Sequence, residues 1–327
     1  MSLGGPEGDV SEKQPRIPHL DLAKLRLTAL QQRPSKVSAD ALAHPSTPGG
    51  SFDDFWNSLP DILAARDLRS LVDDVAMAHR NGKIVAIGIG GHVIKTGLAP
   101  LIIDFMKSGI VNAVAGNGSI CIHDVELALA GKTSEDVDEA LRDGSFGMAG
   151  ETANFILGAI AGEGPKVGLG RSLGNALVRR ENANANVSVL AQGALLDVPV
   201  TVHVAIGTDI VHMHPQADGA ALGAATLRDF RRFSDVIAGV TDGGVYINFG
   251  SSVIMPETFL KALSVARNLG YRGRFVTADF DFIRHYRPRT NVVTRPHLDG
   301  GKGYMFTGHH ELMIPLFFAG MRSALAR

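Results

Sequence analysis

Cysteine is almost absent from the sequence. Cys121 is the single cysteine in 327 residues, so an intrachain disulfide bond is excluded. A chain without disulfides fits a reducing compartment, and we expect the protein in the cytoplasm. Because Cys121 lies between two isoleucines, we interpret it as a small core residue rather than as a nucleophile.

The sequence also lacks an excess of charge of either sign. It has 32 Lys and Arg residues against 33 Asp and Glu residues, with a formal net charge of -1. Nucleic acids and acidic membrane surfaces are bound by a basic face, so we expect neither as a partner. The short basic run at residues 228–233 is interpreted as a solvated helix face.

Long apolar runs are missing as well. The longest one near the C-terminus, residues 312–320, is about half of the roughly 20 residues that a spanning helix needs. Residues 1–15 are polar and rich in glycine, and little periodicity follows them. We therefore expect a partly disordered arm and linker over residues 1–51, and a single α/β nucleotide-binding domain over residues 52–327.

What the sequence does contain is an alternation of short apolar runs and helical patterns. The apolar runs show no polar alternation, which is typical of strands that are buried on both faces. They are residues 83–90, 110–116, 198–207, 244–250, 274–281 and 304–308. The alternation predicts an α/β fold, with a doubly wound, mostly parallel, Rossmann-like sheet and helices on both of its faces.

Small residues follow several of the predicted strands. Gly90-Gly91, Gly118-Ser119 and residues 250–252 all stand where a strand turns into a helix. Doubly wound sheets bind ligands at these carboxyl ends, where small residues let a ligand approach the backbone. A tight turn explains any one loop equally well, but the repetition favours a shared ligand cleft. The dinucleotide fingerprint itself is incomplete, because Val93 replaces its third glycine.

Two local predictions concern helix ends. Thr133-Ser134 precedes a run of acidic residues and predicts a helix cap. His123 and Asp124 are adjacent, and adjacent helical residues do not face each other. We therefore expect Asp124 to support the N-terminus of its own helix, and His123 to face the cleft.

A family resemblance emerges from these motifs. Residues 90–129, with their small-residue loop and His123-Asp124 pair, resemble the first nucleotide-binding segment of deoxyhypusine synthase and its bacterial relatives. The resemblance continues through "IGTDIVHMH", "GGVYINFGSSVIMP", "FVTADFD" and "FTGHHELMIPLFFAGM", and so covers about residue 52 to the C-terminus. It implies a deoxyhypusine synthase-like fold and an NAD-dependent homotetramer, with active sites at dimer interfaces and a small-molecule substrate.

The resemblance also implies site residues. Those placed at the NAD site are Gly90, Gly91, His92, Thr96, Gly118, Ser119, Gly250, Ser251, Ser252, Thr277, Ala278 and His309. Four others are candidate catalytic residues. Lys302 lies on a glycine-rich loop and is the candidate nucleophile, while His123 faces the cleft. His203 and Asp209 stand where the family has two aspartates.

Departures from the family limit what activity we expect. The family transfers a butylamine group from spermidine through an imine with a lysine. Here the Lys-His that follows the triple glycine is Met255-Pro256, and Arg295, near the lysine position, cannot form an imine. We therefore expect a divergent NAD-dependent transferase or oxidoreductase acting on a small amine or another small molecule, and not an efficient deoxyhypusine synthase.

Two other classes of function stay open. Histidine is a metal ligand, and convergence of His203, His212 and His309 would make a metal-dependent hydrolase the alternative. We prefer to read these histidines as polar residues that line the cleft, and we expect no metal site. The other alternative is a non-catalytic nucleotide-binding scaffold, because a fold alone does not establish catalysis.

Overall fold

The computed structural model describes residues 1, 16–180 and 184–327. The chain divides into two compact units, Met1–Ala41 and Leu42–Arg327. The described part of the first unit contains short 3₁₀ turns with no buried residue in them. These turns are Leu22–Lys24, Leu30–Gln32 and Ala39–Ala41. The spacing of apolar residues in 20–32 predicts a short helix, and the structure has none there. The partial disorder predicted for residues 1–51 stays a prediction, and residues 2–15 of this arm lie outside the described residues.

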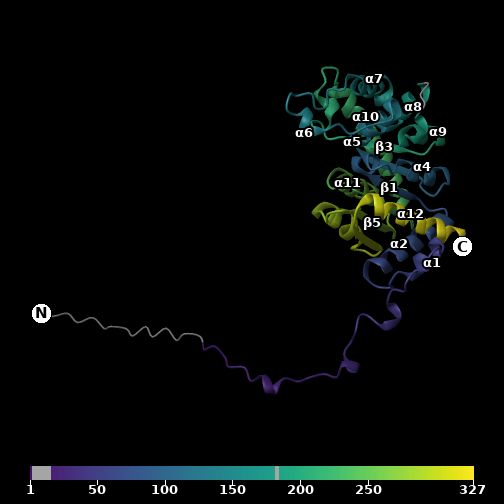
Figure 1. The fold of residues 1–327 in the computed structure, drawn as a ribbon. Coiled ribbons are helices and arrows are strands. Elements are labelled where there is room, and N and C mark those ends of the chain that lie inside the picture. Colours follow the sequence, from purple (N-terminus) through teal and green to yellow (C-terminus); the bar gives the residue numbers. More distant parts are fainter. Residues whose placement is uncertain (2–15, 181–183) are drawn as a thin grey trace. The chain divides into compact units, whose positions relative to one another are not determined.

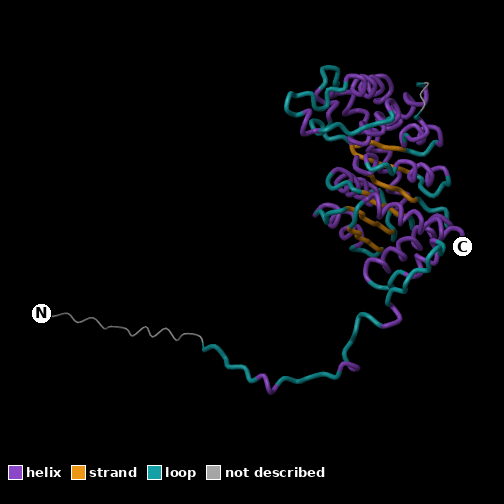
Figure 2. Tube along the Cα trace, viewed as in Figure 1, coloured by secondary structure: helices purple, strands orange, loops and turns teal. Residues whose placement is uncertain are grey.

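The second unit is built around a six-stranded parallel sheet (Figures 1 and 2). The strands are β1 (Val85–Ile89), β2 (Ala113–Asn117), β3 (Val200–His203), β4 (Val245–Phe249), β5 (Val276–Asp281) and β6 (Lys302–Thr307). Their order is β3-β2-β1-β4-β5-β6, and every neighbouring pair is parallel. The chain builds one half of the sheet outward from β1 and then returns to add β4 on the other side of β1. The predicted doubly wound α/β fold is confirmed.

Helices connect the strands and cover the sheet. They are α1 (Phe52–Ser58), α2 (Leu63–Arg80), α3 (Gly91–Lys95), α4 (Ala99–Lys107), α5 (Gly118–Ala130), α6 (Val137–Ala140), α7 (Gly150–Val167), α8 (Leu169–Arg179), α9 (Val189–Leu196), α10 (Gly219–Val240), α11 (Ile254–Asn268) and α12 (His310–Ala326). A π-helix lies at Pro288–Thr294, and 3₁₀ turns lie at Ala185–Val187, Ile210–Met213 and Arg295–His297. Among the described residues, no helix combines the length and the apolarity needed to cross a bilayer.

The two faces of the sheet pack in two separate cores. On one face, Ile87 and Phe249 belong to a large cluster that includes residues of α2, α4 and α12. On the other face, Ala86 and Tyr246 pack against α10 and α11. The ring of Tyr246 stacks on Phe259 of α11, with 4.2 Å between the ring centroids. Burial on both faces explains why the strands read as unbroken apolar runs.

Several predicted helix ends need correction. The apolar spacing of residues 92–109 predicts one helix that ends at Gly109. The structure has two helices there, α3 and α4, because Gly97 adopts φ +81° and stops the first one. Thr133 and Ser134 do not cap a helix. The next helix, α6, is capped by Asp136, whose carboxylate accepts a hydrogen bond from the N–H of Glu139 at 3.1 Å.

Asp124 supports a different helix from the one expected. Its carboxylate accepts hydrogen bonds from the hydroxyl of Ser188 and from the N–H groups of Val189 and Leu190, at 2.5, 2.7 and 3.1 Å. Asp124 therefore joins α5 to the N-terminus of α9. Burial raises the pKa of Asp124 to about 6, against the opposing effect of these three hydrogen bonds.

Candidate functional site

The loops after β1 and β4 meet at the carboxyl edge of the sheet. The N–H of Gly90 donates to the carbonyl of Phe249 at 2.9 Å. A Cβ atom on Gly90 would collide with the carbonyl oxygen of Gly250, and Gly250 itself has φ +65°. Both positions therefore require glycine. The strand order reverses at this point, and such a reversal is where doubly wound sheets bind their ligands.

A buried amide holds the second of these loops. Asn248 of β4 is fully buried, and its Nδ2 donates to the carbonyl of Ser251 at 2.9 Å and to Asp279 Oδ1 at 2.7 Å. Burial raises the pKa of Asp279 to about 7. Asn248 thus holds the loop of residues 250–252 through Ser251, and Asp279 holds the amide of Asn248. Their positions inside apolar strands did not suggest this role.

The loop after β2 contributes Ser119 to the site and comes close to Asp209. The hydroxyl of Ser119 donates to Asn117 Oδ1 at 2.9 Å, at the start of α5. The carboxylate of Asp209 occupies the space that a side chain on Gly118 would need. Asp209 Oδ2 is buried and has no hydrogen-bond partner among the described residues, and burial raises the pKa of this carboxyl group. Asp209 Oδ2 is therefore an acceptor without a donor, while the same carboxylate accepts from the backbone N–H of His212.

His123 lies beside a small cavity next to this loop. The cavity has a volume of about 210 Å³ and is lined by residues that include Lys95, Ser119, Glu126 and Asp209. His123 is half-buried, and burial together with the charge of Lys95 lowers its pKa to about 4. The imidazole is therefore neutral at pH 7.

Hydrogen bonds determine which nitrogen of His123 carries the proton. The hydroxyl of Thr133 donates to Glu126 Oε2 at 2.5 Å, and His123 Nδ1 lies 2.8 Å from the same hydroxyl oxygen. A hydroxyl has one proton, so Thr133 accepts its second hydrogen bond from Nδ1–H. The lone pair of His123 is then on Nε2, which has no partner among the described residues. A neutral imidazole with a free Nε2 can accept a proton.

Three aromatic rings gather on the other side of the switch point. His92, Phe282 and His310 lie with ring centroids 5.3–5.7 Å apart. His310 is fully buried, burial lowers its pKa, and its Nε2 lies 3.7 Å from the carboxylate of Asp281. The neighbouring His309 is exposed and pairs with Glu311 at 3.8 Å. His310, Phe282 and Asp281 therefore stand at this edge, although the sequence pointed to His309.

The structure brings only some of the predicted residues together. Gly90, Gly91, His92, Gly118, Ser119, His123, Asp209 and residues 250–252 lie at the carboxyl edge or beside its cavity. Thr96 follows α3, and its hydroxyl donates to the carbonyl of His92 at 2.9 Å. Lys95 also lines the cavity, although the sequence pattern places it in a helix that leads away from the strand ends.

Lys302 does not reach this edge. It is the first residue of β6, at the amino end of the sheet, and its ammonium group lies 2.8 Å from the carboxylate of Asp74. The glycine-rich loop before it therefore leads away from the carboxyl edge, and the expected position of Lys302 in the cleft is wrong.

Thr277 and Ala278 lie too early in β5. The hydroxyl of Thr277 is buried against Val292 and His297, and Ala278 is part of the apolar core. The strand continues to Asp281, so Asp281 and Phe282 occupy the edge where these two residues were expected.

His203 ends β3, but its ring turns into the core. It packs 5.2 Å from the ring of Phe233 and shares a hydrogen bond of 3.0 Å with Thr201. Burial lowers its pKa to about 3. His212 Nδ1 accepts from the N–H groups of Gly207 and Asp209, so it shapes the Asp209 loop. Within residues 16–180 and 184–327, no three His, Cys, Asp or Glu side chains are grouped to hold a metal ion.

Comparisons with known proteins give a likeness of fold. A scan against protein-family models finds no match, and a search of the curated proteins finds none. A protein from Entamoeba histolytica, provisionally assigned as a deoxyhypusine synthase, is 10% identical with a TM-score of 0.51, over 86% of this chain and 97% of that chain. Unliganded AgrE is 16% identical with a TM-score of 0.51, over 81% of this chain and 34% of that chain.

A third solved structure is more distant. A protein from Methanococcus maripaludis S2, provisionally assigned as LOR/SDH, is 14% identical with a TM-score of 0.49, over 78% of this chain and 70% of that chain. The chain spans about a third of AgrE, which has also been crystallised with ornithine and NAD+. At these identities, the comparisons establish the architecture of the sheet and its helices and leave the reaction open.

Proposed function

We propose that this chain, whose fold is deoxyhypusine synthase-like, is a divergent NAD-dependent transferase or oxidoreductase that acts on a small amine or another small molecule. The observation that carries the proposal is the carboxyl edge of the sheet. There, the reversal of strand order coincides with two glycine-bearing loops, an unpaired carboxylate oxygen and a neutral histidine.

The residues at this edge fit part of a nicotinamide dinucleotide. Asp209 Oδ2 lacks a donor, and ribose hydroxyl groups are donors that acidic residues bind in this class of fold. The first turn of α5 offers backbone N–H groups next to the cavity, as anion sites at helix N-termini do. When bound, NAD would supply a hydride acceptor. The cavity of about 210 Å³ is smaller than typical ligand pockets, so one chain encloses only part of such a molecule.

His123 is the proposed proton acceptor. Its free Nε2 and its neutral ring at pH 7 let it take a proton from the amine or hydroxyl group of a substrate during oxidation, and its lowered pKa makes it a weaker base than a solvent-exposed imidazole. The chain of hydrogen bonds through Thr133 to Glu126 fixes the tautomer and the ring orientation. Lys95 is the amine that lines the same cavity, and it is a better-placed candidate than Lys302 for any imine with a carbonyl intermediate.

A second copy of the chain would complete the site. Exposed apolar side chains lie around the carboxyl edge. Among them are Phe282 and Ile283 after β5 and Leu312 in the first turn of α12, which are 44%, 53% and 67% exposed. Such side chains favour an interface. We propose a homotetramer with sites at dimer interfaces, in the cytoplasm. Light scattering at micromolar concentration tests this assembly, and a monomer would contradict it.

Calorimetry with NAD, NADH, ATP and S-adenosylmethionine tests the cofactor. We expect NAD or NADH to bind, and Asp209→Asn to weaken binding by about tenfold because a charge-assisted hydrogen bond is lost. Lys302→Met is the control and should bind as the wild type does. If no nucleotide binds, the proposal fails.

A panel of amines with NAD, monitored by NADH fluorescence, then separates an enzyme from a scaffold. Oxidation that depends on His123 supports the proposal. Binding without turnover on any member of the panel supports the non-catalytic scaffold.

A further inference from the structure

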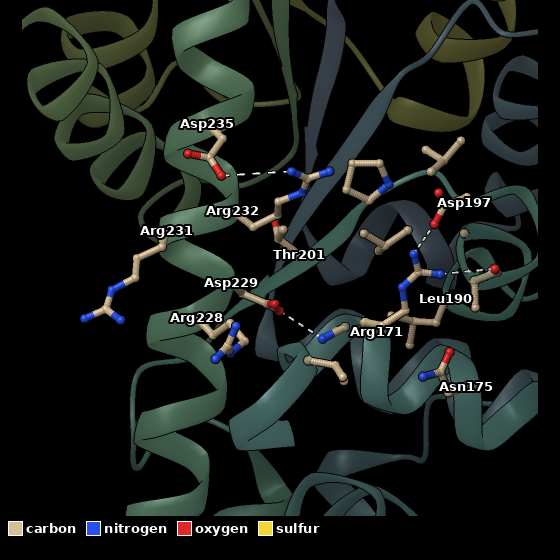
Figure 3. Close-up of a pocket in the computed structure, with 17 residues that line it drawn as sticks. Arg171, Asn175, Leu190, Asp197, Thr201, Arg228, Asp229, Arg231, Arg232 and Asp235 are labelled. Atoms are coloured by element: carbon tan, nitrogen blue, oxygen red, sulfur yellow. Dashed lines mark hydrogen bonds and ion pairs between the residues drawn. The ribbon is translucent and has the colours of Figure 1, made fainter. Parts of the chain in front are cut away.

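A larger cavity lies at the opposite end of β3 from Asp209. It has a volume of about 550 Å³ and is bounded by α8, α9, α10 and the amino end of β3 (Figure 3). Its volume is within the range of small-molecule sites. Because β3 is an edge strand, the cavity opens at the side of the sheet, away from the loops of the candidate cofactor site.

Arginine side chains dominate the wall of this cavity. Arg171 comes from α8, and Arg228, Arg231 and Arg232 come from α10. In Figure 3, Arg171, Arg228 and Arg232 border the cavity, whereas Arg231 points away from Arg171. Arg228 and Arg232 are four residues apart and so lie on one side of their helix. Two like charges at this spacing destabilise a helix unless an anion lies between them.

The carboxylates of the cavity leave these arginines incompletely paired. Asp197 pairs with Arg171, which also donates to the carbonyl of Ala194 at 3.2 Å. Asp235 lies 3.9 Å from Arg232, at the limit of an ion pair. Arg228 donates through Nε to the carbonyl of Pro165 at 3.1 Å, and no carboxylate pairs with it among the described residues. The outer nitrogens of Arg228 and most of those of Arg232 are therefore free to bind an anion.

Asp229, the third aspartate of the cavity, has a structural role. It is 3% exposed, and its Oδ2 accepts hydrogen bonds from the N–H groups of Gly170 and Val202 at 2.9 and 2.7 Å. These bonds tie α10 to α8 and to the free edge of β3. Burial raises the pKa of Asp229 to about 7, so its charge is partly lost near neutral pH. Asp229 therefore neutralises less of the positive charge of the arginines than an exposed aspartate would.

We propose that this cavity binds a small soluble phosphomonoester. Arg228 and Arg232 hold the phosphate, because a guanidinium group presents paired N–H donors that match two phosphate oxygens and two such groups balance a dianion. The apolar wall formed by Leu190, Val198 and Pro199 receives the body of the ligand. This inference is independent of the proposed cofactor site, since no residue of one cavity lines the other.

Calorimetry on the full chain at constant ionic strength tests the site, with inorganic phosphate, glycerol 3-phosphate and succinate as probes. We expect glycerol 3-phosphate to bind more tightly than inorganic phosphate, and succinate to bind least. Arg228→Gln and Arg232→Gln should each weaken glycerol 3-phosphate binding by about tenfold, as expected for loss of one charge-assisted pair. Arg179→Gln, which removes the same charge from α8 at an ion pair with Glu163, is the matched control and should bind as the wild type does.

Three results would overturn the proposal. One is the absence of saturable binding of either phosphate probe to the wild type. Another is equal binding by the wild type and the folded Arg228→Gln and Arg232→Gln variants, with folding checked by circular dichroism. The last is tighter binding of succinate than of glycerol 3-phosphate, which would assign the cavity to dicarboxylates. Binding of NAD, measured in parallel, should be the same in the wild type and in Arg228→Gln.

Discussion

The ammonium group of Lys302 lies 2.8 Å from the carboxylate of Asp74, at the end of the sheet opposite the candidate cofactor site. Asp74 also accepts a hydrogen bond from the hydroxyl of Tyr304 at 2.8 Å. Lys302 thus joins β6 to α2 at the amino end of the sheet, whereas the cavity beside His123 lies at the carboxyl end, next to the loop after β2. Lys302, which the glycine-rich motif suggested as a nucleophile, therefore has a structural role at the amino end of the sheet.

Replacing Lys302 therefore tests structure rather than chemistry. Lys302→Met should lower the free energy of unfolding by no more than about 1 kcal/mol, because its side chain is 57% exposed and exposed ion pairs contribute little. Urea unfolding measures this change. Trapping with borohydride in the presence of NAD and spermidine should label no lysine at position 302. A labelled Lys302 would contradict the structure.

Gly90→Ala should damage the switch point. Its Cβ would collide with the backbone carbonyl of Gly250, and the backbone has little room to move. We expect a loss of about 2 kcal/mol in stability, as for overpacked sites, together with weaker nucleotide binding. Gly158→Ala is the control, since a Cβ there meets no atom within 4 Å and α7 should gain about 0.5 kcal/mol. Thermal unfolding compares the two, and equal effects would contradict the close approach.

Asp124→Ala should be among the more costly single substitutions. It removes the acceptor of three buried donors at the N-terminus of α9. Unpaired buried donors are expensive, so the free energy of unfolding should fall by about 3 kcal/mol. Asp124→Asn keeps one acceptor oxygen and should recover part of the loss. Denaturant unfolding measures both variants. If Asp124→Ala costs no more than Asp124→Asn, the cap is not stabilising.

His203 should make the fold sensitive to acid. Its pKa falls from 6.5 to about 3 on folding because the ring is buried. Below pH 6.5 the unfolded chain takes up a proton that the folded chain does not, so the contribution of His203 to stability falls as the pH drops from 6.5 toward 3. Asp124, Asp229 and Asp279, whose pKa values are raised by burial, contribute in the opposite direction. The slope from His203 alone reaches about 1.4 kcal/mol per pH unit at most.

Urea unfolding at about pH 7 and about pH 5 measures this slope. His203→Asn, which keeps a partner for Thr201, removes this contribution, so that from about pH 7 to about pH 5 the variant should lose less stability, or gain more, than the wild type does. His19→Asn, an exposed position in the first unit, is the control and should leave the pH dependence unchanged. An unchanged slope in His203→Asn would show that other groups cause the acid sensitivity.

The arrangement of the candidate site shows where sequence patterns were sufficient. Gly90, Gly118 and residues 250–252 were predicted at strand ends, and all lie there, because a glycine or serine directly after an apolar strand marks the end of that strand. The strand at residues 274–281 was also predicted, and β5 does end at Asp281. The family motif nevertheless placed Thr277-Ala278 at the cofactor site, whereas both lie in the middle of the strand, paired with β4 and β6.

The sequence by itself determined the six strands, most of the helices and the class of fold. Those features depend on hydrophobic periodicity, which acts between residues a few positions apart. The tertiary structure alone decided that Lys302 pairs with Asp74, that Asp209 fills the space beside Gly118, and that His310 rather than His309 is buried near His92. These contacts join segments up to 228 residues apart in the chain. Each contact depends on the end of the strand at which a loop lies and on the face of the sheet to which a side chain points. Strand order and register determine these two features, and they are set only when the sheet is assembled.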